Sequence, residues 1–408
     1  MKIYHSSSLH TNNSLFLAIL AASSFTILAI SYILASTGRL VQLSTHLSFR
    51  PLSSAQSMSY QKELLVAQLA VQRAAILTKK VFHEKAKGTV SKDDKSPVTI
   101  GDFGAQALII QAIKHNFPKD EVVGEEEASS LREQKSLSSQ IWELVKDIKL
   151  DDAEADAILG GPLPSEDAML QAIDQGNSAG GPKGRTWALD PIDGTKGFLR
   201  GGQYAVCLAL MVDGDVKVGV LGCPNLPVDD SAPLTEGIGA NQTDEGNGVL
   251  FSAIAGQGAD SRPLSKAGLL LSKPISMRPV PDISQATFCE SVEAGHSSKG
   301  DNAAIAEILG ITSKPVQMDS QAKYGSIARG AGDLYLRLPV RKDYQEKIWD
   351  HAAGDLIVRE AGGEVTDARG KRLDFSKGRT LKDNKGVVAA PKAVHSDVLK
   401  AVQKVLGI

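Results

Sequence analysis

Apolar residues recur at helical spacing in two segments that follow residue 58. In residues 60–87 they recur at intervals of three, four and seven residues, which place them on one face of a helix. The second segment, "VTIGDFGAQALIIQAIKHNFP", predicts an extended piece and then a helix that begins at Gly101–Asp102 and ends before Pro118. The apolar positions of the first helix are Val66, Leu69, Ala70, Leu77 and Val81.

Shorter apolar runs predict strands. "EVVG" at residues 121–124 predicts a strand that leads into acidic residues, and "TWALD" predicts a buried strand that ends at Asp190. The segment "YAVCLALMVDGDVKVGVLGCP" predicts a β-hairpin, because two apolar runs flank the turn-forming pair Asp213–Gly214.

Strand and helix candidates alternate beyond residue 245, which predicts an α/β second domain. A domain typically has about 150 residues, so a chain of 408 residues has room for two. We therefore expect an α+β fold with a first domain at residues 59–244, a second at residues 245–405, and an active site at their junction.

Residues 1–57 differ from the rest of the chain. They contain no Asp or Glu, and residues 15–35 form a run of 21 residues without a charge, long enough to cross a bilayer. A membrane anchor fits this run, and membrane contact is expected only there. Met58 also begins a stretch typical of the start of a globular domain, so an alternative-start extension or a mitochondrial targeting peptide stays open. The catalytic domain is expected to face the cytoplasm.

Composition favours a soluble enzyme with a small-molecule substrate. Hydrophobic residues make up 42% of the chain and charged residues 23%, and the formal net charge of −2 gives no reason to expect binding to nucleic acid. Cys207, Cys223 and Cys289 form neither a disulfide framework nor a zinc-binding spacing, so a reducing compartment is expected. We expect a monomer.

The segment "ALDPIDGTKGFLRGG" places two aspartates three residues apart around a proline. Asp190 and Asp193 can supply the carboxylate oxygens that Mg²⁺ prefers, and Pro191 keeps their turn from becoming a continuous helix. Thr195 and the amides that follow it offer donors to a phosphate. Asp, Pro and Gly are also common in plain turns, so this segment alone leaves both a turn and a metal site open.

Three further acids stand at the ends of predicted elements. Asp102 opens a helix, Glu125 follows a strand, and Asp350 opens the helix in "WDHAAGDLIVREAGG"; each alone is also typical of a helix N-cap or a solvated acid. If the fold brings them to the two-aspartate segment, their oxygens repel one another unless cations neutralise them. Together they favour a phosphate-ester hydrolase in which several magnesium ions polarise the phosphate and activate water.

Long motifs in consistent order resemble the inositol-monophosphatase-like, lithium-sensitive phosphatase superfamily. They include "SPVTIGDFGAQ", "VVGEEEAS", "ALDPIDGTKGFLRGGQYAVCLAL" and "IWDHAAGDLIVREAGG", and the resemblance covers about residues 58–405. With "GHSS" and "DSQAKYGSIARGAGDLYLRLP", the chain is more similar still to the 3'(2'),5'-bisphosphate nucleotidase branch, especially its fungal and plant members. The resemblance implies a layered α/β/α/β/α fold.

The resemblance also implies a cluster of two or three Mg²⁺ ions. Glu125, Asp190 and the main-chain carbonyl of Ile192 would hold one ion. Asp190, Asp193 and Asp350 would hold a second, so that Asp190 bridges the pair. Inhibition by Li⁺, and in some members by Na⁺, is expected through these sites.

The resemblance also implies a catalytic role for Asp102 and Thr195. Asp102, with Thr195 as its hydrogen-bonded partner, would activate the attacking water, helped by a third, weakly held metal near Glu125. Displacement would be in line, with the metals stabilising the leaving oxygen and the charge of the phosphoryl group.

The substrate side of the pocket would come from the second domain. By resemblance, His296, Ser320, Lys323 and Arg337 contact the retained phosphate, the ribose and the base, and Thr195 also touches the substrate. A lysine and an arginine suit a second phosphate, which a singly phosphorylated sugar would not require. Taken alone, His296 is equally typical of a loop and Arg337 of a strand surface.

The implied activity is hydrolysis of the 3'-phosphate of adenosine 3',5'-bisphosphate to AMP and phosphate, and of 3'-phosphoadenylyl sulfate, in support of sulfate assimilation and salt tolerance. Two alternatives stay open: an inositol mono- or polyphosphate phosphatase on the same fold, and a membrane-tethered nucleotide-binding protein without turnover. A haloacid-dehalogenase-type phosphatase is disfavoured, because its two aspartates stand two residues apart and here they stand three apart around a proline.

Overall fold

The computed structural model describes residues 59–83, 89–91, 97–230, 234, 246–293, 298–338, 340–341 and 343–408. Residues 58–408 form one compact unit. The leader at residues 1–57, with its predicted anchor at residues 15–35, lies outside the described residues. Within the described ranges, no helix is both long enough and apolar enough to cross a membrane.

Helices and strands alternate along much of the chain. The helices are α2 (Gln61–His83), α3 (Ile100–Asn116), α4 (Ser129–Glu133), α5 (Lys135–Val145), α6 (Ala153–Ile158), α7 (Glu166–Asp174), α8 (Thr195–Arg200), α9 (Lys299–Leu309), α10 (Ala322–Ala328), α11 (Ala352–Glu360) and α12 (His395–Leu406), with short 3-10 helices η1 (Ile283–Gln285), η2 (Ile348–Asp350) and η3 (Phe375–Lys377). The strands are β1 (Thr89–Ser91), β2 (Pro97–Thr99), β3 (Glu121–Gly124), β4 (Arg185–Asp193), β5 (Ala205–Val212), β6 (Asp215–Pro227), β7 (Asn247–Ile254), β8 (Ala259–Pro263), β9 (Lys273–Ile275), β10 (Phe288–Glu290), β11 (Val316–Gln317), β12 (Leu334–Arg337), β13 (Gly363–Thr366) and β14 (Val387–Pro391).

The predicted early elements are confirmed. Helices α2 and α3 form where apolar residues recur at helical spacing, and β3 and β4 form at the two predicted strands. The predicted hairpin consists of β5 and β6, which pair antiparallel. Its turn residues Asp213 and Gly214 have φ angles of 51° and 80°, as the tight hairpin turn with two left-handed residues requires.

The larger sheet has seven strands in the order β3-β4-β5-β6-β7-β8-β9. β3 runs parallel to β4, and the other neighbours are antiparallel. Gly124, the last residue of β3, lies opposite Leu189 in β4. Glu125 follows Gly124, and Asp190 follows Leu189. The parallel pairing therefore brings these two acids side by side.

Strand β5, "AVCLALMV", is apolar at every position because both of its faces are covered. Even-numbered residues such as Val206 and Leu208 belong to a core shared with α2 and α3. Odd-numbered residues such as Ala209 and Met211 belong to a core shared with α10 and α11. The alternation of side chains along a strand therefore supplies two cores from one segment.

Strand β6 carries glycines where helices approach it closely. A Cβ atom at Gly219 would lie 2.8 Å from the carbonyl oxygen of Ala353 in α11, and one at Gly222 would lie 2.7 Å from a methyl group of Val71 in α2. Residues three apart on a strand face opposite sides. Helices α2 and α11 therefore cover opposite faces of the larger sheet.

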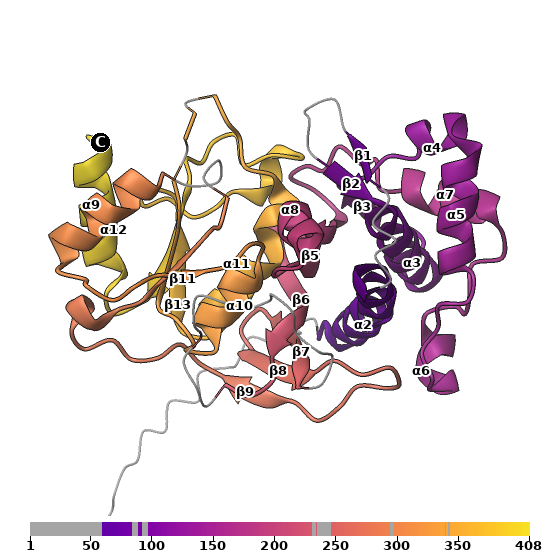
Figure 1. Cartoon of the computed structure of the whole chain (residues 1–408), viewed down its shortest axis with the longest axis horizontal. Coiled ribbons are helices and arrows are strands. Elements are labelled where there is room, and N and C mark those ends of the chain that lie inside the picture. Colours follow the sequence, from indigo (N-terminus) through magenta and orange to yellow (C-terminus); the bar gives the residue numbers. More distant parts are fainter. Residues whose placement is uncertain are drawn as a thin grey trace, which may run out of the picture. The chain divides into compact units, whose positions relative to one another are not determined.

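The smaller sheet has five strands in the order β11-β10-β12-β14-β13. In β12, Leu334 and Leu336 pack in a core with α9 and α12, whereas Tyr335 packs in the core with α10 and α11. The layers thus follow the order α2 and α3, larger sheet, α10 and α11, smaller sheet, α9 and α12 (Figure 1). This order confirms the predicted α/β/α/β/α fold.

The predicted boundary at residues 244/245 lies between two strands of one sheet, because β6 pairs with β7. The change from the larger to the smaller sheet occurs between β9 and β10 instead. The sequence before residue 245 resembles a long loop, which suggested a domain boundary there. The pairing of β6 with β7 across this stretch has no local sequence signal. The division into two domains stays a prediction.

Candidate active site

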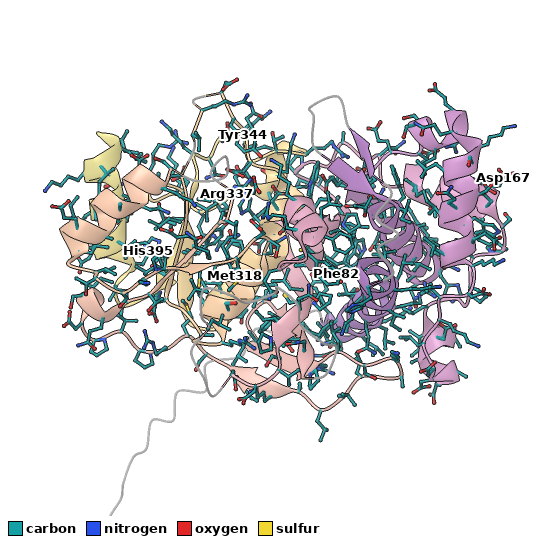
Figure 2. The ribbon with its side chains drawn as sticks, in the orientation of Figure 1. Phe82, Asp167, Met318, Arg337, Tyr344 and His395 are labelled. Carbon is teal, nitrogen blue, oxygen red and sulfur yellow. The ribbon has the colours of Figure 1, made fainter. Side chains whose placement is uncertain are left out.

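A cavity of about 370 Å³ lies where the ends of several elements meet: β3, the β4–α8 turn, β12 and η2. Figure 2 labels two of its wall residues, Arg337 from β12 and Tyr344 from the loop that follows. Most of the site residues predicted from sequence come together here. Those in the wall are Glu125, Asp190, Ile192, Asp193, Thr195, Arg337 and Asp350.

The two-aspartate segment is the bulged end of strand β4. On a regular strand, residues three apart face opposite sides. The register of β4 with β5 shifts between Asp190 and Asp193, and both residues line the cavity. Asp190 Oδ1 accepts a hydrogen bond from the N–H of Ile192 at 3.1 Å, and Asp193 Oδ2 accepts one from the N–H of Gln321 at 2.5 Å. These bonds fix both carboxylates while other oxygens remain for a ligand.

Glu125 and Asp350 reach the cavity from neighbouring elements. The N–H of Glu125 donates to the carbonyl of Leu189 at 3.2 Å, which sets Glu125 beside the end of β4. Asp350 is the last residue of η2, and His351 stands between it and the first residue of α11. Asp350 is therefore not the N-cap of that helix, the alternative that its sequence position had left open.

Burial and the charges of neighbouring carboxylates raise the pKa values of Asp190, Asp193 and Asp350. Burial, followed by the charges of Glu125 and Asp193, raises the pKa of Asp190 well above its usual range. Burial raises the pKa of Asp193 to about 6 and that of Asp350 to about 7. Carboxylates gathered in this way stay ionised at neutral pH only with compensating cations, and an all-oxygen donor set fits Mg²⁺.

Asp102 stands behind the cavity and not in its wall. Thr99 is the N-cap of α3, and Asp102 Oδ2 accepts hydrogen bonds from the N–H and the hydroxyl of Thr99 at 2.8 and 2.5 Å. Asp102 is thus the partner of the cap and not the cap itself. Its charge still contributes to the raised pKa of Asp190, so it lies close to the cluster. The Thr195 hydroxyl donates to the carbonyl of Ile192 at 3.2 Å; the bond between Asp102 and Thr195 stays a prediction.

Arg337 brings a positive charge to the cavity through a buried network. Its Nε lies 2.7 Å from Glu346 Oε2, and its Nη2 lies 3.6 Å from Asp350 Oδ2. The ring of His351 connects Glu346, at 3.2 Å, to the hydroxyl of Tyr324, at 2.9 Å. Burial alone would raise the pKa of Glu346, but the charge of Arg337 holds it at about 2. Arg337 is therefore held in place by a carboxylate that stays ionised.

The same network contains a second group of metal-ligating side chains. Ligand atoms of Glu346, Asp350 and His351 lie within 4.8 Å of one another. However, Glu346 Oε2 already contacts both Arg337 Nε and His351 Nε2. A cation bound at Glu346 Oε2 would lie against the Arg337 guanidinium and be repelled, so we interpret Glu346 and His351 as parts of an ion-pair network and not as metal ligands. Asp350 differs from them because it also lines the cavity.

Ser320 and Lys323 lie in a buried turn and do not line the cavity. The Lys323 ammonium donates to the carbonyls of Met318 and Ser320 at 3.2 and 2.9 Å, and burial lowers its pKa to about 8. Ser320 has a φ of 70°, and its hydroxyl accepts a hydrogen bond from the N–H of Ala322 at 3.1 Å. Their polar atoms bond within the turn, and their predicted contact with substrate stays a prediction. His296 lies outside the described residues.

Several residues of the cavity wall were not predicted from the sequence. Lys196 directly follows Thr195, a residue that the sequence did indicate, and three others stand within the six residues before Asp350. Arg379 had no signal at all. The wall residues that were not predicted include Lys196, Tyr344, Lys347, Trp349 and Arg379.

Residues 60–406 match the inositol monophosphatase family. The chain belongs to this family. A relative from Emericella nidulans, named 3'(2'),5'-bisphosphate nucleotidase, is 74% identical over 352 residues, which cover 86% of this chain and 100% of the relative. Relatives of the same name from Schizosaccharomyces pombe and Oryza sativa are 48% and 44% identical; the matches cover 85% and 86% of this chain and 97% and 96% of the relatives.

Solved structures of the family share the fold at much lower identity. IMPase from Thermotoga maritima matches with a TM-score of 0.55 at 19% identity, over 85% of this chain and 98% of its own. SuhB from Mycobacterium tuberculosis matches with a TM-score of 0.50 at 20% identity, over 85% of this chain and 97% of its own. These likenesses confirm the predicted fold.

Proposed function

We propose that the protein is a magnesium-dependent 3'(2'),5'-bisphosphate nucleotidase that converts adenosine 3',5'-bisphosphate to AMP and phosphate. The observation that carries this proposal is one cavity whose wall brings Glu125, Asp190, Asp193 and Asp350 together with Arg337, an arginine paired with the buried Glu346. The names of relatives at 74%, 48% and 44% identity support the choice of substrate.

We assign the metal ligands as follows. Glu125, Asp190 and the carbonyl of Ile192 would hold one Mg²⁺, and Asp190, Asp193 and Asp350 a second. When bound, magnesium supplies a Lewis acid that polarises the phosphoryl oxygens and favours the ionised form of water. The raised pKa values of the free carboxyls support this assignment, because they indicate a site in which negative charge lacks compensation.

The remaining steps belong to side chains of the chain itself. The Thr195 hydroxyl lies in the cavity wall, where it can orient the attacking water, and Asp102 behind it would accept the proton. Arg337 would hold the phosphate that is not cleaved, since a guanidinium binds phosphate oxygens through parallel hydrogen bonds. Lys196 and Lys347 add positive charge at the wall.

Phosphate release from two substrates tests the proposal. The full chain, assayed with magnesium, is expected to prefer adenosine 3',5'-bisphosphate over inositol 1-phosphate in kcat/KM. A preference for the inositol ester would contradict the assignment and favour the alternative phosphatase. Tight nucleotide binding without turnover would favour the non-catalytic alternative.

The pH dependence of stability tests the carboxylate cluster separately. Without metal, the pKa values of Asp193 and Asp350, about 6 and about 7, exceed the ordinary aspartate value of 3.8. The folded state therefore binds more protons than the unfolded state in this window, so the stability that these two groups contribute is present at low pH and is lost as the pH rises through about 6 to 7. Because bound magnesium keeps these groups ionised, the magnesium-induced rise in thermal midpoint should grow from about pH 5 to about pH 8. A rise that is larger at the lower pH would contradict this expectation.

A further inference from the structure

Arg379 lies in the wall of the cavity, yet its side chain bonds to main-chain carbonyls. Nη2 donates to the carbonyl of Gly124 at 2.6 Å, and Nη1 donates to the carbonyls of Ser178 and Gly176 at 3.0 and 3.4 Å. Within the described part of the chain, no carboxylate oxygen lies within 4 Å of its guanidinium nitrogens. The positive charge of Arg379 therefore lies near the acidic cluster without forming an ion pair with any of its carboxylates.

On one side, this arginine fixes the segment that carries Glu125. Gly124 ends β3 and directly precedes Glu125, so the bond to its carbonyl restrains the backbone on which the Glu125 side chain is mounted. The N–H of Gly124 donates to the carbonyl of Gly176 at 2.7 Å, and Arg379 also bonds to that carbonyl. The guanidinium thus closes a small network around the end of β3.

On the other side, Arg379 fixes the segment that carries Asp350. Its guanidinium carbon lies 4.9 Å from the ring centre of Trp349, the residue directly before Asp350. The main-chain carbonyl of Arg379 accepts a hydrogen bond from the N–H of Ile348 at 3.2 Å. Beside this bond, Lys347 and Thr380 form a β-bridge. Both the main chain and the side chain of Arg379 therefore hold η2.

We propose that Arg379 is a positioning residue that sets the distance between Glu125 and Asp350 and so tunes the affinity of the site for magnesium. The inference rests on the metal site of the proposed function and extends it to a residue outside the ligand set. A planar guanidinium can bond to three carbonyls and stack on an indole at once, whereas a lysine ammonium is a point donor on a flexible stem. Charge alone should therefore not replace it.

The chain offers a matched control in Arg329. Its Nη1 donates to the carbonyl of Pro227 at 2.7 Å, and its guanidinium carbon lies 5.9 Å from the ring centre of Phe251. It thus makes the same two kinds of contact as Arg379 but does not line the cavity. Arg329→Gln should cost stability by the same means without touching the metal site.

The experiment measures Mg²⁺ binding to the full chain by calorimetry, without substrate, in four proteins: wild type, Arg379→Gln, Arg379→Lys and Arg329→Gln. Loss of a group that orients metal ligands typically weakens binding by about 10- to 100-fold. We expect the magnesium Kd to rise by about tenfold or more in both Arg379 variants and to stay unchanged in Arg329→Gln. Should Arg379→Gln fail to fold, Arg379→Lys, which keeps the charge and most of the stem, carries the test.

Kinetics at saturating magnesium separates positioning from direct substrate contact. Positioning predicts that activity of the Arg379 variants recovers substantially as magnesium is raised. Unchanged magnesium affinity with a raised KM for the nucleotide would overturn the inference while leaving the proposed function intact. A wild-type chain that binds no magnesium would overturn the proposed function, and this inference with it.

Discussion

Replacing Asp190 with asparagine is expected to reduce turnover by about a thousandfold, because a metal that polarises a phosphoryl oxygen is worth several kcal/mol and each factor of ten about 1.4 kcal/mol. The same change is expected to raise the thermal midpoint of the metal-free protein. Burial and the charges of Glu125 and Asp193 raise the pKa of Asp190 well above its usual range, so folding at neutral pH requires either a buried, repelled carboxylate or its protonation. Asparagine avoids both costs. Asparagine keeps the Oδ1 that accepts the N–H of Ile192.

Asp333 supplies the control for Asp190→Asn. Asp333 is equally buried, but it pairs with the Arg278 guanidinium, at 3.0 Å from its Nε, and accepts the N–H of Thr287 at 2.8 Å. Asp333→Asn should therefore lower the thermal midpoint and leave the magnesium response intact. If Asp190→Asn also lowered the midpoint, or still showed the full magnesium shift, Asp190 would not be a ligand in a repulsive cluster.

Replacing Arg337 with methionine is expected to affect both stability and substrate choice. The substitution leaves the Glu346 carboxylate buried without the guanidinium that pairs with it. Removing one partner of a buried ion pair lowers the free energy of unfolding by about 3 to 5 kcal/mol. Loss of a charge-assisted hydrogen bond of about 1.5 to 3 kcal/mol should also lower kcat/KM for adenosine 3',5'-bisphosphate by about 10- to 100-fold, mainly through KM. Activity on 3'-AMP, which lacks the second phosphate, should fall much less.

Two comparisons separate these effects. The double variant Arg337→Met with Glu346→Gln should regain part of the stability, because no buried charge is left without a partner. Arg359→Met is the matched control, because Arg359 Nη2 lies 2.8 Å from Oδ2 of another buried carboxylate, Asp355. This variant should not change the substrate preference. If Arg337→Met lowered activity on both nucleotides equally, Arg337 would not recognise the second phosphate.

The sequence predicted what depends on local pattern. The unbroken apolar run of β5 indicates a strand covered on both faces, and Asp213–Gly214 indicates the hairpin turn that follows it. The acids Glu125 and Asp190 were identifiable because Glu125 directly follows a predicted strand and Asp190 ends another. The family resemblance implied that these two acids share a metal ion, and in the structure the parallel pairing of β3 with β4 brings them together.

The sequence could not predict what depends on contacts between distant residues. The bulge that turns both Asp190 and Asp193 toward the cavity is a property of the pairing with β5. The burial of the Lys323 ammonium against two carbonyls of its own turn likewise has no local sequence signal. Arg379 and Gly124 are 255 positions apart, and a single arginine in "SKGRT" carries no local sign of that contact.

The central proposal is that this carboxylate cavity removes the 3'-phosphate of a bisphosphorylated nucleotide. Product analysis after incubation of the full chain with adenosine 3',5'-bisphosphate and magnesium tests it most directly. We expect equal amounts of 5'-AMP and inorganic phosphate, and neither product when a chelator removes the metal. Formation of 3'-AMP, or release of phosphate that does not depend on magnesium, would contradict it.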